Sequence, residues 1–295
     1  MKKGTETLVV RRKLFFTMAI DSREYLQNIM PTEEMMKDLR SRKVDLFAFL
    51  ERKWCCPIAE PSKAWTKAED NIAILNLKSY DEWLRNIGKK TRNMIRKAEK
   101  TGITTDVAVT DDRLAEGIWK IFNETPIRQG RAFPHYGISL DSVKQNLQSF
   151  PNFTYVGAYL QNEMVGFAHL IHGDHLTMIS QLLSLQKTRD KAVNNALIAK
   201  AIQFCSNNHI EWIMYGRIGN HPTLDDFKEN NGFRKLLLNR YYLPLTGKGK
   251  LAIKLKLNRE LKDTLPQSAK TALFPLYNWI SRMRARIRFA SMQRP

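Results

Sequence analysis

Apolar and polar residues between positions 72 and 246 alternate with the period of strands and then of helices. Short apolar runs with every-second-residue alternation indicate strands, and apolar residues three and four apart indicate helices. On this basis strands are expected at 72–77, 104–109, 152–160, 163–171 and 175–183, and helices at 79–101, 111–124 and 139–149. The alternation predicts a mixed α/β class with a central, largely antiparallel sheet flanked by helices.

Three of the expected strands follow one another with only short polar turns between them. Gln161 and Asn162 separate the first strand from the second, and Gly173 and Asp174 separate the second from the third. Residues of these types favour tight turns, so neighbouring strands should pair antiparallel. The segment 152–183 is therefore predicted to be an antiparallel meander.

The run that begins at Ala192 is the most informative part of the chain. It opens with a helix whose apolar face is marked by Ile198, Ala201, Ile202 and Cys205. Asn194 or Asn195 stands where the N-cap belongs, because an asparagine oxygen accepts hydrogen bonds from the first free amides. Those amides could also face the phosphates of a ligand, with Arg189 and Lys191 adding positive charge. A plain cap and a phosphate site are compatible interpretations.

A strand, a loop and a short helix complete this run. Residues 211–215 read as a strand, and the loop GRIGNHP then interrupts it. The segment LDDFKENN reads as a short helix with Gly232 just past its end, and Phe233 opens the next strand. Loops at strand ends collect functional residues, so a ligand site is expected here.

Composition and length fit a globular chain in three parts. Hydrophobic residues make up 43% of the 295 positions and charged residues 26%, as in compact soluble domains. We divide the chain into an N-terminal segment at 1–71 that packs on the main domain, the main domain at 72–246, and a basic helical extension at 247–295. Segment 1–71 shows no chemistry, and a helix is expected at 269–289.

Positive charge is strong and unevenly placed. The formal net charge is +19, and residues 247–295 and 85–100 hold most of the excess. A solvated basic face is one interpretation of 85–100, and binding to a phosphate-rich ligand or an acidic carrier is another. The apolar and basic residues of 269–289 suit either a plain surface helix or an anionic partner such as a lipid surface, an acidic protein or RNA.

Three cysteines point to reduced, structural thiols. Cys55 and Cys56 are adjacent and Cys205 is isolated, so none has the spacing of a zinc site. His169, His172 and His175 lie close in sequence, but on two strands of one hairpin they need not converge, and no metal site is expected. No apolar run is long enough to span a bilayer and the N-terminus lacks a secretory core. We expect a cytoplasmic protein, with peripheral attachment to the inner membrane surface left open.

Three segments carry a resemblance to a known family: TRNMIRKAEKTGI, the asparagine-led helix ending near Asn208, and YGRIGNHPTLDDFKENNGF. Together they make residues 72–245 similar to the FemAB-like branch of the GNAT acyltransferase superfamily. The resemblance implies a GNAT fold, an acyl donor carried on CoA or tRNA, and transfer to an amine. It implies no permanently bound cofactor, with acyl-CoA, such as acetyl-CoA, as co-substrate.

The resemblance also implies roles for individual residues. The donor would be bound by Arg189, Lys191, Asn194, Asn195, Arg217 and Lys228, and the acceptor by Arg92, Arg96 and Lys97. The family loop has the form Arg/Gln-x-x-Gly-x-Gly/Ala, and Ala192 and Asn194 fill its glycine positions. Because glycines let backbone amides approach phosphates closely, these two residues argue against the ordinary mode of acetyl-CoA binding. A tRNA carrier therefore stays open.

The polar segment 125–137, at a place similar to the family's acceptor-side loop, holds candidates for the chemistry. Transfer to an amine needs a base for the amine proton and an acid for the leaving group. His135 could be the base and Tyr136 the acid, and Arg128 and Arg131 would suit an acidic acceptor. A surface loop with satisfied polar groups is the alternative.

These observations predict a FemAB-like GNAT N-acyltransferase. It would move an acetyl or aminoacyl group to an amine on an amino sugar or peptide of a surface polymer. The alternative is a non-catalytic protein on the same fold that binds nucleic acid, anionic lipid or an acidic carrier.

Overall fold

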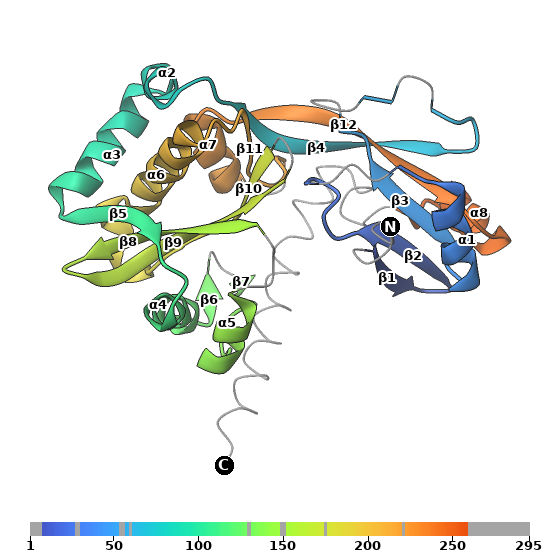
Figure 1. The fold of residues 1–295 in the computed structure, drawn as a ribbon, viewed down its shortest axis with the longest axis horizontal. Coiled ribbons are helices and arrows are strands. Elements are labelled where there is room, and N and C mark those ends of the chain that lie inside the picture. The colour runs from blue at the N-terminus through green and yellow to red at the C-terminus, as the bar shows by residue number, and fades with distance from the viewer. Residues whose placement is uncertain are drawn as a thin grey trace, which may run out of the picture. The chain divides into compact units, whose positions relative to one another are not determined.

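The computed structural model of the chain describes residues 8–26, 30–52, 57–58, 61–128, 131–147, 152–173, 176–219 and 222–258. These residues fall into two compact units (Figure 1). The first unit comprises the described residues within 8–87, 172–179 and 205–258, and the second comprises those within 88–171 and 180–204. The division predicted at 71 and 246 concerns functional parts and stays a prediction.

The first unit is built on a sheet of long strands. In hydrogen-bonding order these are β1 (Leu8–Lys13), β2 (Phe16–Asp21), β3 (Leu46–Leu50), β12 (Arg234–Pro244), β4 (Thr66–Asn76) and β11 (Trp212–Met214). The start of β10 (Leu176–Ser184) pairs with β11 in parallel, and β2 pairs with β3 in parallel. The other pairs are antiparallel. Its helices are α1 (Glu33–Ser41), α2 (Tyr80–Asn86), α7 (Pro222–Asn230) and α8 (Gly247–Lys254).

Both faces of this sheet are covered, as two neighbouring tyrosines show. Tyr241 packs on one face with Leu39 of α1, and Tyr242 packs on the other with Ala252 of α8. Neighbouring side chains of a strand point to opposite faces of the sheet, and a sheet with a core on each side therefore buries both tyrosines.

The second unit holds the predicted meander. Its strands are β8 (Phe153–Leu160), β9 (Glu163–His172), the end of β10, and β5 (Ile103–Ala108), which pairs antiparallel with β8. Gln161 and Asn162 form the β8–β9 turn with φ angles of 51° and 66°, the backbone that such turns need. The antiparallel meander is confirmed.

Helices cover both faces of the second unit's sheet (Figure 1). On one face lie α3 (Lys89–Lys100) and α6 (Val193–Asn207), and on the other α4 (Asp112–Asn123) and α5 (Leu140–Asn146). A short 3-10 helix, η1 (Gln186–Lys191), joins β10 to α6, and β6 (Ile127–Arg128) and β7 (Arg131–Ala132) form a small hairpin. The segment expected to be a polar loop at 125–137 therefore contains two short paired strands, β6 and β7.

The single helix expected at 79–101 is wrong. The chain leaves α2 at Ile87 with ψ of 152° and enters α3 at Gly88 with ψ of 151°, both extended. Residues 87 and 88 therefore separate two helices, and α2 belongs to the first unit while α3 belongs to the second. Apolar residues continue at helical spacing on both sides of Gly88, so the hydrophobic pattern alone does not reveal the break.

Other expectations have mixed outcomes. Cys205 is a free, buried thiol whose pKa burial raises to about 12, so it is structural as expected. Cys55, Cys56 and the helix expected at 269–289 lie outside the described residues. Within the residues that the structure describes, no helix has the length and apolarity needed to cross a bilayer.

Candidate active site

Lys228 in α7 is the most unusual charged residue of the first unit. Its side chain is only 3% exposed, and no other lysine of the described residues is buried. The Nζ atom donates a hydrogen bond to the Arg217 carbonyl at 2.7 Å and lies 5.1 Å from the ring centre of Tyr215. Burying an ammonium group is costly unless the group is compensated, so a buried lysine needs an explanation.

Compensation for the Lys228 charge is incomplete. Burial lowers the pKa of Lys228, and the charge of Asp225 offsets this only in part. Among the described residues, no carboxylate forms an ion pair with Nζ within 4 Å. A buried lysine with a lowered pKa is typical of a functional site. An apolar side chain of similar size would fill the same space without the cost of burying a charge.

The backbone around Lys228 is held by local turn chemistry and by β4. Gly216 has φ of 61°, a conformation that favours glycine. Its carbonyl accepts a hydrogen bond from the Ala73 N–H of β4. Gly232 closes α7 with φ of 87°, which confirms its expected place just past the helix. Trp83 of α2 then donates to the Asn231 carbonyl at 2.9 Å. These contacts fix the start of the loop that precedes α7 and the C-terminal end of α7.

Arg217 is anchored by a chain of buried ion pairs. One guanidinium nitrogen of Arg217 lies 2.7 Å from Asp70, whose second oxygen accepts from Arg240 Nε at 2.9 Å. Arg240 in turn donates two hydrogen bonds to Glu24, at 2.6 and 2.7 Å. Burial and the charge of Glu24 raise the pKa of Tyr25 beside this network. The network holds the Arg217 carbonyl, and with it Lys228 Nζ, in a defined place.

In the second unit, η1 and α6 form the predicted phosphate-binding segment. Ala192 adopts a left-handed conformation with φ of 56°, and α6 begins directly after it. Asn195 N–H donates to the Ala192 carbonyl, so Asn194 and Asn195 lie within the first helical turn. The expected asparagine N-cap is therefore wrong by two or three residues. Arg189 is exposed and Lys191 is half-buried.

Glu124, at the C-cap of α4, fastens η1 to the rest of the unit. Its carboxylate accepts from the N–H groups of Gln186 and Lys187, at 2.6 and 3.1 Å, and pairs with Arg128 at 3.2 Å. Arg128 also donates to the carbonyls of Ser184 and Ile121. Both terminal nitrogens of the Arg128 guanidinium thus contact the protein itself, and the expected role of Arg128 in acceptor binding stays a prediction.

His135 is half-buried against aromatic rings. Its imidazole stacks on Phe122 with ring centres 4.4 Å apart and lies 5.3 Å from Phe133. Burial and the charge of Arg128 lower the pKa of His135, so the ring is neutral at neutral pH and able to accept a proton. Tyr136 is half-buried beside it. Arg131 belongs to β7, opposite Arg128.

The other histidines are held separately. His169 stacks on Tyr155 at 4.4 Å and lies 3.0 Å from Ser180 Oγ, and His172 lies 2.8 Å from Thr177 Oγ1. His175 lies outside the described residues. Across the part of the chain that the structure describes, no group of His, Cys, Asp or Glu could hold a metal ion.

Helix α3 turns its basic residues away from its buried face. Thr91, Ile95 and Ala98 are buried, whereas Arg96 and Lys97 are exposed. Arg92 is half-buried. The expected basic face therefore exists, and it is available to a ligand.

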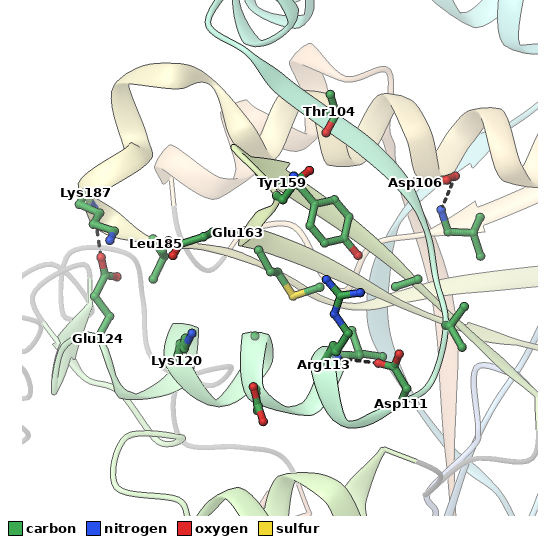
Figure 2. A pocket seen from close by; sticks show the side chains of 18 residues that line it. Thr104, Asp106, Asp111, Arg113, Lys120, Glu124, Tyr159, Glu163, Leu185 and Lys187 are labelled. Atoms are coloured by element: carbon green, nitrogen blue, oxygen red, sulfur yellow. Dashed lines mark hydrogen bonds between the residues drawn. The ribbon is translucent and has the colours of Figure 1, made fainter.

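A groove of about 840 Å³ runs along α4 in the second unit (Figure 2). It lies between α4, β5 and the β8–β9 turn, and it reaches η1 at Leu185 and Lys187. Its charged lining consists of five acids and three bases: Asp106, Asp111, Glu116, Glu124, Glu163, Arg113, Lys120 and Lys187. Sequence reasoning did not find this groove, because its lining comes from segments that only the fold brings together. An acidic lining suits an amine-bearing group better than an anion.

The structure divides the predicted site residues between the units. Arg217 and Lys228 meet in the first unit, and sequence reasoning missed their neighbours Tyr215, Asp70 and Arg240. The remaining residues lie in the second unit, on α3, in the segment 125–137 and at η1 and α6. The one sequence signal for Tyr215 was its place at the end of a short strand before a glycine loop.

Solved structures of known proteins share this fold. FemX matches with a TM-score of 0.56 and 13% identity over 79% of this chain and 83% of its own. The C-terminal domain of a putative lysylphosphatidylglycerol synthetase from Agrobacterium fabrum matches with a TM-score of 0.55 and 10% identity, over 84% and 83%. L-PGS from Bacillus licheniformis matches at 0.52 and 14%, over 80% and 79%.

At these identities the likeness establishes the fold. The expected resemblance to the FemAB-like GNAT branch is confirmed at that level, as is the mixed α/β class with its largely antiparallel sheet. No protein-family model matches the sequence, and no curated protein sequence matches it either.

Proposed function

We propose that this protein is a GNAT-type acyltransferase that moves an acyl or aminoacyl group from a carrier to an amine. The shared fold supports transfer chemistry in general, since FemX and lysylphosphatidylglycerol synthetase lie among its structural neighbours. Lys228 carries the proposal for this chain, because a buried ammonium group is costly for folding and useful for catalysis.

In the proposed reaction the amine nitrogen attacks the carbonyl carbon of the donor ester or thioester. A C–N bond forms and the carbonyl oxygen takes up negative charge. Lys228 Nζ would donate a hydrogen bond to that oxygen, since only one of its three N–H groups is used by the Arg217 carbonyl. The C–O or C–S bond of the donor then breaks, the leaving group takes a proton, and the amine gives one up.

His135 and Tyr136 remain our proposals for the base and the acid. The neutral imidazole of His135 has the protonation state that a base needs. Arg189, Lys191, Asn194 and Asn195 of the second unit remain our proposals for binding the phosphates of the donor, and Arg217 of the first unit remains a separate donor-binding proposal. Arg92, Arg96 and Lys97 would bind an anionic part of the acceptor.

The finer assignments rest on the resemblance alone. The donor would be an acyl-CoA or an aminoacyl-tRNA, used as a co-substrate. The acceptor would be an amino sugar or a peptide of a surface polymer, and the reaction would take place in the cytoplasm or at the inner membrane surface. Ala192 is left-handed, a conformation that favours glycine, and it stands at a position where the family loop has glycine.

A donor panel tests this proposal. The full chain is melted with acetyl-CoA, with longer acyl-CoAs and with aminoacyl-tRNA, and each mixture is then assayed for transfer to amino sugars and amine-bearing peptides. We expect a rise in Tm with one donor class, because a ligand of the folded state stabilises it, and transfer that Lys228→Met abolishes. A rise in Tm with polyanions alone and no transfer from any donor would instead support the non-catalytic alternative.

A further inference from the structure

Exposed apolar side chains are concentrated at one end of the first unit. The described residues expose ten large hydrophobic side chains, and six of them belong to β1, the β1–β2 turn and α8: Val9, Val10, Leu14, Phe15, Leu251 and Leu255. Scattered exposed apolar residues are ordinary, whereas a group in one place marks an interaction surface.

Hydrogen bonds to Asp45 bring these segments together. Thr17 N–H at the start of β2 donates to Asp45 Oδ2 at 2.9 Å, and Thr246 at the N-cap of α8 donates to Oδ1 at 2.6 Å. The Lys43 carbonyl accepts from the Thr17 hydroxyl at 2.9 Å. The β1–β2 turn, the turn before β3 and the start of α8 therefore lie side by side, at the right of Figure 1.

Helix α8 carries leucines on its outer face. Gly249 and Ala252 are buried against the sheet, while Leu251 is 47% exposed and Leu255 is 53% exposed. These two leucines are four residues apart and so lie on one stripe of the helix. The outer face of a surface helix is normally polar, so packing of this unit does not account for them.

The β1–β2 turn also departs from the usual residue preference of its position. Leu14 is 79% exposed and has φ of 32°, in the range where two-residue hairpins favour glycine or asparagine. Phe15 beside it is also exposed. Residues that break a local rule without a gain in packing are expected at functional surfaces.

Basic residues surround these apolar side chains. Residues 8–17, 38–45 and 246–257 contain Arg11, Arg12, Lys13, Arg40, Arg42, Lys43, Lys248, Lys250, Lys254 and Lys256. The same ranges contain two acids, Asp38 and Asp45. Asp38 pairs with Arg42 at 3.3 Å, and Asp45 is buried among its hydrogen bonds. The charge on this surface is therefore almost wholly positive.

We propose that this surface, made of the β1–β2 turn and the outer face of α8, binds an anionic lipid bilayer. Leu14, Phe15, Leu251 and Leu255 would enter the interfacial region, and the basic residues would face lipid phosphates. Nucleic acid fits less well, because its backbone offers no partner for aliphatic side chains. This proposal does not depend on the proposed catalysis.

Vesicle sedimentation tests the proposal with the full chain. Binding is measured to phosphatidylcholine vesicles with and without phosphatidylglycerol, and we expect phosphatidylglycerol to strengthen it by about tenfold or more. Leu251→Gln/Leu255→Gln should weaken binding by about tenfold, since two leucines lose their transfer from water. Lys250→Gln/Lys254→Gln should weaken it by about fivefold per lysine removed. Leu237→Gln, an exposed leucine on β12 outside this surface, should bind as the wild type.

Hydrogen exchange gives a second readout that needs no variant. Amides of residues 13–16 and 250–256 should gain protection when phosphatidylglycerol vesicles are added, and Lys228→Met should behave in the same way. The proposal is overturned if the leucine variants bind as the wild type, if vesicles without anionic lipid bind equally well, or if protection is confined to other segments. Competition by RNA with no effect of the leucine changes would assign the surface to nucleic acid instead.

Discussion

Lys228 shows how one buried charge relates stability to function. Its ammonium group is almost completely removed from water and is held by a carbonyl and an aromatic ring, without a carboxylate in ion-pair contact among the described residues. A methionine of similar length would remove the desolvation cost. The proposed oxyanion contact would be lost at the same time.

We therefore expect Lys228→Met to separate stability from activity. Its free energy of unfolding at neutral pH should be equal to the wild type or higher by about 1 kcal/mol, because a buried charge is replaced by an apolar group. Its kcat should fall by about 100-fold or more, as for the loss of an oxyanion donor. Lys235→Met, an exposed lysine on β12, should change neither quantity.

The pH dependence of stability provides a further check on Lys228. The pKa is lowered in the folded state and is about 10.5 in the unfolded chain. The unfolded state therefore binds more protons between these two values, and wild-type stability rises with pH across that window. The advantage of Lys228→Met should be largest below the folded-state pKa of Lys228 and shrink as pH approaches 10.5. Strong destabilisation of the variant at neutral pH would identify Lys228 as a structural residue.

At the scale of elements, α8 is placed by one close backbone approach. A Cβ added to Gly249 would collide with the Asp45 carbonyl, whereas a Cβ at Gly247 meets nothing within 4 Å. Both glycines belong to the same helix, so they form a matched pair.

Gly249→Ala should destabilise the fold by about 2 kcal/mol or more, because the backbone at Asp45, just before β3, must shift. Gly247→Ala should be neutral or stabilise by about 0.5 kcal/mol, since alanine favours helix. Urea unfolding of both variants measures the difference. Equal effects would show that α8 packs on the sheet less tightly than its contacts indicate.

The η1 segment depends on one carboxylate from another element. Glu124→Gln replaces an acceptor of two backbone N–H groups with a side chain that offers only one acceptor oxygen. We expect a loss of about 1–3 kcal/mol in unfolding free energy and faster hydrogen exchange at residues 186–191. If η1 binds the donor, the KM for the donor rises as well.

Glu116→Gln is the control for this prediction. Glu116 lies on the same helix and is exposed, so its replacement removes the same charge without touching η1. A similar loss of protection in both variants would indicate a general effect of charge rather than the anchoring contact.

At the scale of the whole molecule, a net charge of +19 works against compactness. The exposed basic residues of α3 contribute to this repulsion, since the helix has one acid, Glu99. Melting temperature should therefore rise when salt is added to a dilute buffer. Salt weakens the repulsion because the Debye length falls to about 8 Å at physiological ionic strength.

Arg96→Gln/Lys97→Gln should raise Tm in dilute buffer, and the gain should disappear at high salt. Differential scanning calorimetry at several salt concentrations measures both effects. A variant that melts below the wild type in dilute buffer would show that these residues make stabilising contacts, and their proposed availability to a ligand would be wrong.

Local features of the fold could be predicted from the sequence. The β8–β9 turn, the end of α7 at Gly232 and the apolar face of α6 all follow from residue types within a few positions of one another. The break between α2 and α3 was missed, although Gly88 marks it. The N-cap of α6 was also misplaced, because asparagine near a helix start was taken as the cap.

Tertiary structure decided which residues form the candidate site. Asp70 and Arg240 are 170 positions apart, and Glu24 and Arg240 are 216 apart, so no local pattern joins them. The contacts of Arg128 to Glu124, Ser184 and Ile121 likewise come from the fold, and no local pattern in the sequence predicts them.

The sequence by itself determined the class of fold, the meander, the helix–strand–loop–helix–strand run that begins at Ala192, and the excess of positive charge. It could do so because turn preference, hydrophobic period and charge are properties of neighbouring residues. Only the tertiary structure decided that Lys228 is buried, that Asp45 joins the β1–β2 turn to α8, and that an acidic groove lies along α4. Burial and ion pairing depend on what the fold places opposite a side chain, and that partner comes from distant parts of the chain.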